Sequence, residues 1–181
     1  EKANLFEKAK HNVQCEDRYL KIEKMNCARM LSIAGVSNIG IEVDEKAEVI
    51  ADEYEKLLFQ TGCIDYETII IESTKLLQEK PYVRECISAK YPWLLIDEYQ
   101  DTNHAQYLMA KYIAGKSQNI CAVGDADQSI YSWRGADLRN IMDFREDYPS
   151  AQIIKLEQNY RSTQTILNAA NAVIKNNVER L

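Results

Sequence analysis

The chain has 181 residues, of which 46% are hydrophobic and 28% are charged, and its formal net charge is -6. This length suits one domain or one and a half, and the composition is that of an ordinary water-soluble globular protein. The negative charge excludes a protein that coats nucleic acid through bulk positive charge, but it is compatible with a local groove of a few cations and aromatic side chains.

Neither membrane insertion nor secretion is expected. No apolar run reaches bilayer length, and the N-terminus has neither a signal-peptide core nor an initiator Met, which indicates a piece of a longer protein. The five cysteines are scattered without a C-x-x-C pair, and His11 and His104 lie far apart. We therefore expect free thiols in a cytoplasmic protein and no zinc site.

Residues 1–90 have the pattern of a helical block. Asp44 is a candidate N-cap for a helix that Gly62 would end, because apolar residues recur between them at helical spacing. Asp65 is a candidate N-cap for a second helix, which would stop before Pro81. The remaining predictions for this block are a mostly helical stretch over 1–31 and a loop over 35–40.

After residue 92 the pattern alternates between short apolar strands and helices. The predicted strands are 93–96, 119–123 and 152–156. The predicted helices are 103–114, 137–145 and 162–176. Alternating strands and helices indicate parallel pairing in an α/β sheet. We therefore predict part of a nucleotide-binding sheet that follows the helical block.

The most informative segment follows the first predicted strand and reads DEYQDT over residues 97–102. A buried strand that leads into two adjacent carboxylates is the Walker B arrangement. In it, Asp97 would hold Mg²⁺ through the water shell of the ion, and Glu98 would polarise the attacking water. The alternative is a solvated strand end, since Asp-Glu pairs are common on surfaces, but the complete string favours the catalytic interpretation.

A second segment, GDADQSIYSWRGAD over residues 124–137, follows the second predicted strand. It would emerge at the carboxyl edge of the sheet, where open α/β folds bind ligands. Gln128 can hydrogen-bond either a phosphate or its attacking water. Tyr131 and Trp133 alternate with Arg134, a mixture that suits stacking on unpaired bases. The alternative is that Trp133 is a core aromatic residue and Arg134 is half of a surface ion pair.

A third segment reads NYRS over residues 159–162 and lies just before the last predicted helix. The N-terminus of a helix favours anions, so Arg161 can reach a terminal phosphate there as an arginine finger supplied in cis. The alternative is an exposed arginine without a catalytic role.

These three segments, in this order, resemble those of the UvrD/Rep/PcrA-type superfamily 1 DNA helicases. The resemblance is strongest over residues 91–177 and extends more weakly back to Cys63. It implies an α/β fold with part of a RecA-like P-loop NTPase sheet in the C-terminal half. It divides the chain into a helical 1B-like insertion subdomain (1–90), part of motor lobe 1A (91–155) and the start of the second motor lobe (156–181).

The resemblance also implies an ATP site with Mg²⁺ as its cofactor. Its catalytic residues would be Glu98, Asp97, Gln128 and Arg161. Asp97, through water, and Glu98 would hold the metal. Gln100 and Gln128 would sense the γ-phosphate and relay its state toward DNA. The residues in contact with ATP would be Gln100, Tyr160 and Arg161, with Tyr160 near the adenine.

By the same resemblance, Tyr131, Trp133 and Arg134 would contact single-stranded DNA, with Trp133 as the stacking platform, and Arg134 and Asp137 would brace that loop. The implied function is a bacterial ATP-dependent 3′–5′ DNA helicase or translocase. It would act at junctions of single and double strands, in repair or replication at the nucleoid. Two alternatives stay open, namely the helicase part of a helicase–nuclease and a non-catalytic module that binds DNA or a partner.

The Walker A loop of the family, G-x-x-x-x-G-K-[ST], does not occur in these residues. Gly115-Lys116-Ser117 resembles its end, but Ala110 occupies the place of the first glycine, and the tripeptide follows a predicted helix instead of opening one. We interpret it as a helix C-cap. We therefore expect this piece alone to be inactive, and its incomplete sheet to leave an open edge through which it can dimerise.

Overall fold

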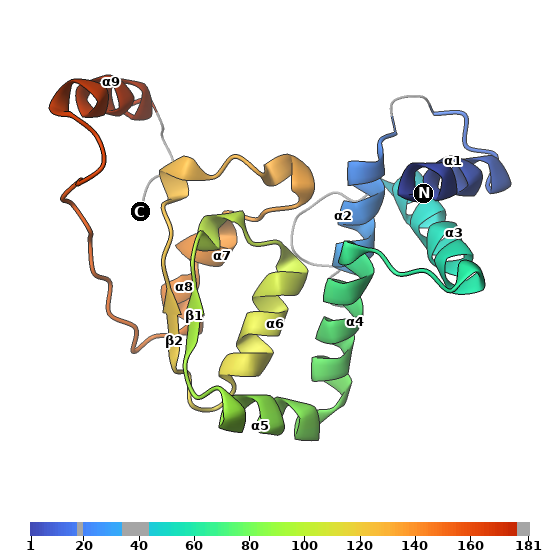
Figure 1. Ribbon diagram of the computed structural model, residues 1–181, viewed down its shortest axis with the longest axis horizontal. Coiled ribbons are helices and arrows are strands. Elements are labelled where there is room, and N and C mark those ends of the chain that lie inside the picture. Colours follow the sequence, from blue (N-terminus) through green and yellow to red (C-terminus); the bar gives the residue numbers. More distant parts are fainter. Residues whose placement is uncertain (18–19, 34–43, 177–181) are drawn as a thin grey trace.

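The computed structural model describes residues 1–17, 20–33 and 44–176, so the loop predicted at 35–40 lies outside the described residues. Helices α1 to α4 gather on one side of the molecule, and a small sheet with α6, α7 and α8 lies on the other (Figure 1). Helix α5 runs below and connects the two sides, whereas α9 lies apart from both. No helix within the described ranges combines the length and the apolar character that crossing a membrane requires.

The helical block forms as its sequence signals predict. Its helices are α1 (Lys2–Asn12), α2 (Ile22–Ser32), α3 (Glu45–Thr61), α4 (Tyr66–Glu79) and α5 (Pro81–Lys90). The Asp44 side chain accepts a hydrogen bond from the Lys46 N–H at the start of α3. Gly62 ends α3 in the left-handed conformation with φ 65°, where a side chain would cost energy. Asp65 caps α4, so both predicted caps are confirmed.

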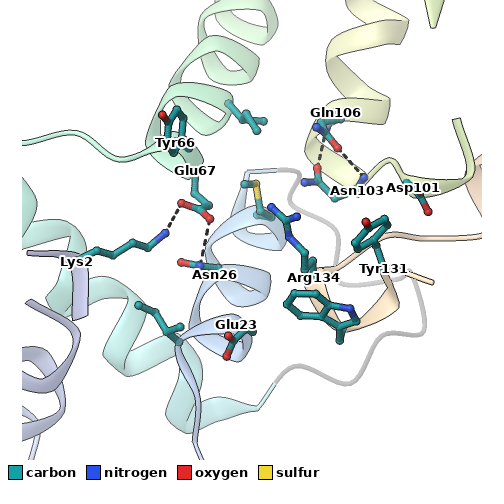
Figure 2. Close-up of a pocket in the computed structure, with 14 residues that line it drawn as sticks. Lys2, Glu23, Asn26, Tyr66, Glu67, Asp101, Asn103, Gln106, Tyr131 and Arg134 are labelled. Carbon is teal, nitrogen blue, oxygen red and sulfur yellow. Dashed lines mark hydrogen bonds and ion pairs between the residues drawn. The ribbon is translucent and has the colours of Figure 1, made fainter. Parts of the chain in front are cut away.

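Polar contacts connect the first helices to α4. The Glu67 carboxylate on α4 accepts hydrogen bonds from Lys2 on α1 and from the Asn26 amide on α2, the latter at 3.3 Å (Figure 2). Helix α1, although it comes first in the chain, is thereby fixed to the fourth helix as well as to α3.

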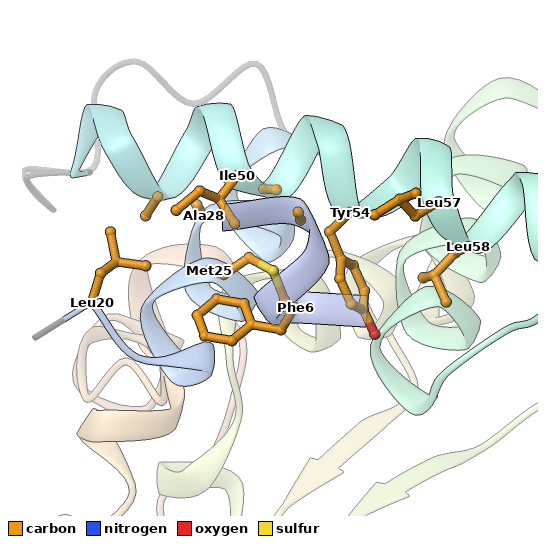
Figure 3. Packing of buried hydrophobic residues seen from close by; sticks show 11 residues of the cluster. Phe6, Leu20, Met25, Ala28, Ile50, Tyr54, Leu57 and Leu58 are labelled. Atoms are coloured by element: carbon orange, nitrogen blue, oxygen red, sulfur yellow. The ribbon is translucent and has the colours of Figure 1, made fainter. Parts of the chain in front are cut away.

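The core of the block lies between α1, α2 and α3 (Figure 3). Buried residues recur along α3 at intervals of three and four, from Ala47 to Leu58, and so form one apolar face. The cluster consists of Phe6, Ala9, Leu20, Met25, Ala28, Ala47, Ile50, Ala51, Tyr54, Leu57 and Leu58. A second cluster of Met30, Ile33, Ile71 and Ala105 joins α2 and α4 to α6 and thus connects the block to the sheet.

A buried arginine ties three of these helices together. Arg29 on α2 is only 2% exposed. Its guanidinium donates to Glu55 on α3 at 2.7 Å and to the Asp65 cap of α4 at 2.9 Å, and it lies 4.9 Å from the centroid of the Tyr54 ring. The Tyr54 hydroxyl donates to Asp65 at 3.1 Å. Burial alone would raise the pKa of Asp65, but hydrogen bonds from Arg29 and Thr68 outweigh it and hold that pKa well below its usual value.

The sheet pairs the first two predicted strands in parallel. Strand β1 (Leu94–Ile96) lies beside β2 (Ile120–Ala122), with Leu95 opposite Cys121. Helix α6 (His104–Ala114) connects them and begins with a capping box, in which Asn103 and Gln106 each bond the backbone N–H of the other. The α/β class, the parallel pairing and this helix are therefore confirmed, although the described sheet has two strands and not the complete RecA-like sheet.

The prediction of a third strand at 152–156 is wrong. Those residues are extended, but they pair with no strand of the described chain, and Ile154 is 78% exposed. Their apolar, β-branched side chains favour a strand, but β propensity forms no strand without a neighbour to hydrogen-bond. The last described helix, α9 (Gln164–Ile174), is shorter than the helix predicted at 162–176 and has no buried residue.

The prediction of a single helix at 137–145 is also wrong, because two short helices take its place. They are α7 (Arg139–Met142) and α8 (Phe144–Asp147), and the break falls at Asp143. The contacts of α8 explain why the helix breaks at Asp143. The Phe144 ring packs edge-on against Tyr99 at 5.6 Å, and Asp147 bonds Lys111 on α6 at 2.6 Å. Tertiary contacts thus override the local helical pattern.

Replacing Arg29 by Met should lower the free energy of unfolding by roughly 3 kcal/mol, the lower end of what breaking a buried ion pair costs, because the Asp65 carboxylate would lose its buried cation and keep only the ion pair with the more exposed Lys2 at 3.3 Å. Urea unfolding of the chain followed by circular dichroism measures this. Lys75→Met is the matched control, since it removes an exposed ion pair with Glu72 and should cost about 0.5 kcal/mol or less. A loss no larger than that of the control would contradict the stabilising role of Arg29.

Candidate functional site

The parallel strands bring the first two sequence motifs to one edge of the sheet. Asp97 and Glu98 follow β1, and Gly124 and Asp125 come soon after β2. The strand pairing continues past the strands themselves, because the Val123 N–H donates to Ile96 at 2.8 Å and the Tyr99 N–H donates to Val123 at 2.9 Å. The adjacency that the strand order predicted is therefore present.

The two carboxylates of the first motif are exposed at this edge. Asp97 accepts a hydrogen bond from the Glu98 N–H at 2.9 Å, and Glu98 adopts a left-handed conformation with φ 50°. A residue with a Cβ adopts that conformation at a cost, and such strain is common at functional sites. A short 3-10 turn, η1 (Tyr99–Asp101), follows directly.

The donor set fits Mg²⁺ better than a tightly chelated metal. Within the described residues, no group of three or more His, Cys, Asp or Glu side chains gathers to hold an ion. Mg²⁺ characteristically takes one or two carboxylates and completes its shell with water and phosphate oxygens. Asp97 and Glu98 are adjacent and open to solvent, so they suit that coordination.

A chain of hydrogen bonds joins three predicted site residues. Gln100 donates from Nε2 to the Glu98 carboxylate at 2.8 Å, and its Oε1 accepts from the Asp125 N–H at 3.0 Å. Asp125 in turn accepts from Gln128 Nε2 at 2.7 Å. Gln128 ends the 3-10 turn η2 (Ala126–Gln128), which Asp125 caps. Sequence reasoning missed Asp125 as the link, although its place just after the strand-ending glycine was a signal.

The residues of the predicted DNA contact lie together on the next turn, η3 (Ser132–Arg134). Trp133 is 58% exposed, so it is not a core aromatic residue. The Arg134 guanidinium lies 5.9 Å from the Tyr131 ring centroid and 5.7 Å from that of Trp133, and no carboxylate in the described part of the chain pairs with it. The three side chains therefore form an open group of two π faces and one cation.

This group forms one wall of a cleft of about 610 Å³ between η3 and helices α2 and α4 (Figure 2). Glu23 of α2 and Glu67 of α4 also line the cleft, and so does Lys2 of α1, which pairs with Glu67. Aromatic faces beside a cation suit an uncharged base. The cleft therefore offers π faces of the kind on which unpaired bases stack.

The end of the predicted DNA-contact segment, residues 131–137, is anchored to the end of the first motif. The Asp137 N–H and the Asn140 side-chain amide both donate to the carbonyl of Thr102, at 3.0 and 2.9 Å. The Asp137 carboxylate bonds Arg139. Asp137 thus holds the segment in place, as the resemblance implied, but it does so mainly through its backbone. Asn140 is buried and was not anticipated from the sequence.

The third motif lies away from the other two. Tyr160 is 88% exposed, and the Arg161 N–H donates to the Asn159 side chain within a local turn. The extended segment that carries them leads away from the sheet to α9 (Figure 1). In the part of the chain that the structure describes, no hydrogen bond, ion pair or ring contact joins either residue to Glu98 or Gln128.

The Gly115-Lys116-Ser117 sequence is a helix end, as interpreted. The Gly115 N–H donates to the carbonyl of Lys111 at the end of α6, and the Ser117 hydroxyl donates to that of Ala114 at 2.9 Å. Both groups serve the helix terminus and do not form a phosphate loop.

Comparison with known proteins gives consistent matches. Residues 2–149 match the family model described as UvrD/REP helicase N-terminal domain. The chain is 52% identical to the ATP-dependent DNA helicase PcrA of Bacillus subtilis over 134 residues. These residues make up 74% of the chain and 18% of that protein. It is 53% identical to PcrA of Staphylococcus aureus over 127 residues, and these residues make up 70% of the chain and 17% of that protein. The chain spans less than a fifth of the length of these relatives, and Tyr160 and Arg161 lie after the range that the family model matches.

Proposed function

The chain belongs to the UvrD/Rep helicase family, and we propose from this that it supplies half of the ATP site and part of the DNA contact of an ATP-dependent 3′–5′ DNA helicase. The observation that carries the proposal is the hydrogen-bonded chain from Glu98 through Gln100 and Asp125 to Gln128. It joins the strand-end carboxylates to the loop that leads to Trp133.

In the proposed ATP site, Asp97 and Glu98 hold Mg²⁺, which when bound neutralises charge on the phosphates. Glu98 accepts the proton of the attacking water, and Gln128 orients that water or the phosphate. Tyr160 packs near the adenine and Arg161 stabilises the developing charge. These two residues act from the second motor lobe, proposed to begin at 156, after lobe 1A (91–155) and the 1B-like block (1–90).

In the proposed DNA contact, an unpaired base stacks on Trp133, beside Tyr131 and Arg134. The cleft next to these residues supports this, because it offers room and π faces. We further propose that the protein acts at junctions of single and double strands during repair or replication, in the bacterial cytoplasm at the nucleoid.

The isolated chain is proposed to dimerise through an open sheet edge, and a monomer in light scattering would contradict this.

Replacing Glu98 by Gln in the full-length protein that contains this chain should lower DNA-stimulated ATP turnover by roughly 10²–10⁴-fold, because the general base is lost. A coupled assay of ADP release measures this. Glu85→Gln on α5, away from the site, is the matched control. The 181-residue chain itself should show no turnover, since its sequence contains no Walker A loop. Normal turnover by Glu98→Gln would refute the assignment of the base.

Replacing Trp133 by Ala should weaken binding of a fluorescein-labelled oligo-dT by roughly 5- to 150-fold, the equivalent of one lost base stack of about 1–3 kcal/mol. Fluorescence anisotropy on the full-length protein measures the Kd. Trp93→Ala is the matched control, because Trp93 is similarly exposed at 65% but precedes β1, outside the DNA-contact segment. Equal affinities of the two variants would exclude Trp133 as a stacking platform.

A further inference from the structure

We propose that Gln100 is a positioning residue that fixes Glu98 and the Asp125 loop relative to each other, and that it acts on ATP hydrolysis without touching the nucleotide. The inference rests on the proposed function and changes one of its details, because the family resemblance implied an ATP contact for Gln100.

The Gln100 side chain is already fully engaged. The residue is 1% exposed. Its Nε2 donates to Glu98 Oε2 at 2.8 Å, and its Oε1 accepts from the Asp125 N–H at 3.0 Å. A phosphate would have to displace one of these partners inside a closed space, where an unpaired polar group is costly. Gln100 therefore serves the two loops and not a ligand.

Glu98 needs such a partner. Its backbone is in the left-handed region, and its side chain is exposed at the edge of the sheet. An exposed glutamate has several rotatable bonds and adopts many conformations unless a contact selects one. Asp97 binds the Glu98 N–H, and Gln100 binds the carboxylate itself. Within the described residues, the Gln100 amide is thus the hydrogen-bond partner that orients the reactive group.

The close packing at Gly124 independently supports the position of the Gln100 side chain between the two loops. A Cβ at residue 124 would lie 2.7 Å from Gln100 Oε1, 2.9 Å from Ile141 Cδ1 and 3.2 Å from the Tyr99 N. The first two distances are shorter than a Cβ tolerates. The backbone of the second loop can therefore approach the Gln100 amide only because residue 124 has no side chain.

The same side chain connects the base to the DNA-contact segment. The Asp125 carboxylate holds Gln128, and the Ser129 hydroxyl donates to the Gln100 carbonyl at 3.4 Å. The chain then runs through Tyr131 to Trp133. A displacement of this loop when a base stacks would pull on Asp125 and, through Gln100, reorient Glu98. Gln100 is thus the junction through which DNA occupancy reaches the base.

The test compares four variants of the full-length protein by steady-state ATPase kinetics with and without oligo-dT. Gln100→Met keeps the length and removes both hydrogen bonds. Gln100→Glu keeps the acceptor for Asp125 but loses the donor to Glu98 and the long contact to Asp101, and it sets a second carboxylate against Glu98. Gly124→Ala adds a methyl group that displaces the Gln100 side-chain amide. Gln78→Met, on the exposed face of α4, is the matched control.

The first three variants should lower the DNA-stimulated kcat by about 100-fold, as expected when a catalytic group is misplaced. The KM for ATP should change by less than about threefold, because no nucleotide contact is removed. The stimulation by DNA should also fall, which a loss of general stability would not produce. Gln78→Met should behave as the wild type.

Hydrogen exchange of the Asp125 amide, measured by mass spectrometry, tests the contact itself without any activity. Exchange should be slow in the wild type and in Gln100→Glu, and about tenfold faster in Gln100→Met and Gly124→Ala. Circular dichroism checks that each variant folds. If Gln100→Met unfolds, Gln100→Glu decides the question, because it keeps the acceptor for the Asp125 N–H while the donor to Glu98 is lost.

Two results would overturn the inference. One is an unchanged kcat in Gln100→Glu and Gly124→Ala. The other is a KM for ATP raised about tenfold at constant kcat, which would make Gln100 a nucleotide ligand. A wild-type protein without DNA-stimulated turnover would instead refute the proposed function. In that case the exchange of the Asp125 amide alone would support or overturn the contact.

Discussion

The parallel pairing of β1 with β2 is the constraint on which the rest of the site depends. Parallel strands end at the same edge of a sheet, so the residues that follow them meet there although more than twenty positions separate them in the chain. The bonds from Val123 to Ile96 and from Tyr99 to Val123 carry this register into the loops. Without it, Gln100 could not reach both Glu98 and Asp125.

The helical block acts on this site from a distance. Arg29 holds α2, α3 and the start of α4 together through buried, charge-assisted hydrogen bonds. The cluster of Met30, Ile71 and Ala105 then seats α2 and α4 against α6. This places side chains of α2 and α4, among them Glu23 and Glu67, in the cleft that Trp133 also lines. The block therefore shapes the cleft beside Trp133, although in the described part of the chain no hydrogen bond or ion pair joins it to Asp97 or Glu98.

Two features of the site run against local preference. Glu98 adopts a left-handed backbone conformation that favours glycine. Gly124 packs so closely against the Gln100 and Ile141 side chains that there is no room for a Cβ. At Glu98, the hydrogen bonds to Asp97 and Gln100 hold a conformation that costs energy for a residue with a Cβ, and at Gly124 the close packing leaves no room for one. Such departures are expected where a reactive group must be held in one orientation, and both lie within the chain of contacts around Gln100.

The sequence by itself determined the features that depend on neighbouring residues. These are the caps at Asp44 and Asp65, the helix at 103–114, and the motifs that follow the two strands. It failed at 152–156, because a strand exists only when another strand pairs with it, and at 137–145, because Phe144 and Asp147 make tertiary contacts that break the helix. Only the tertiary structure decided that Gln100 is buried between two loops and that Asp125 links them. Hydrogen bonds between residues distant in the chain leave no periodic signal in the sequence, so the site was predicted from its motifs while its connections were not.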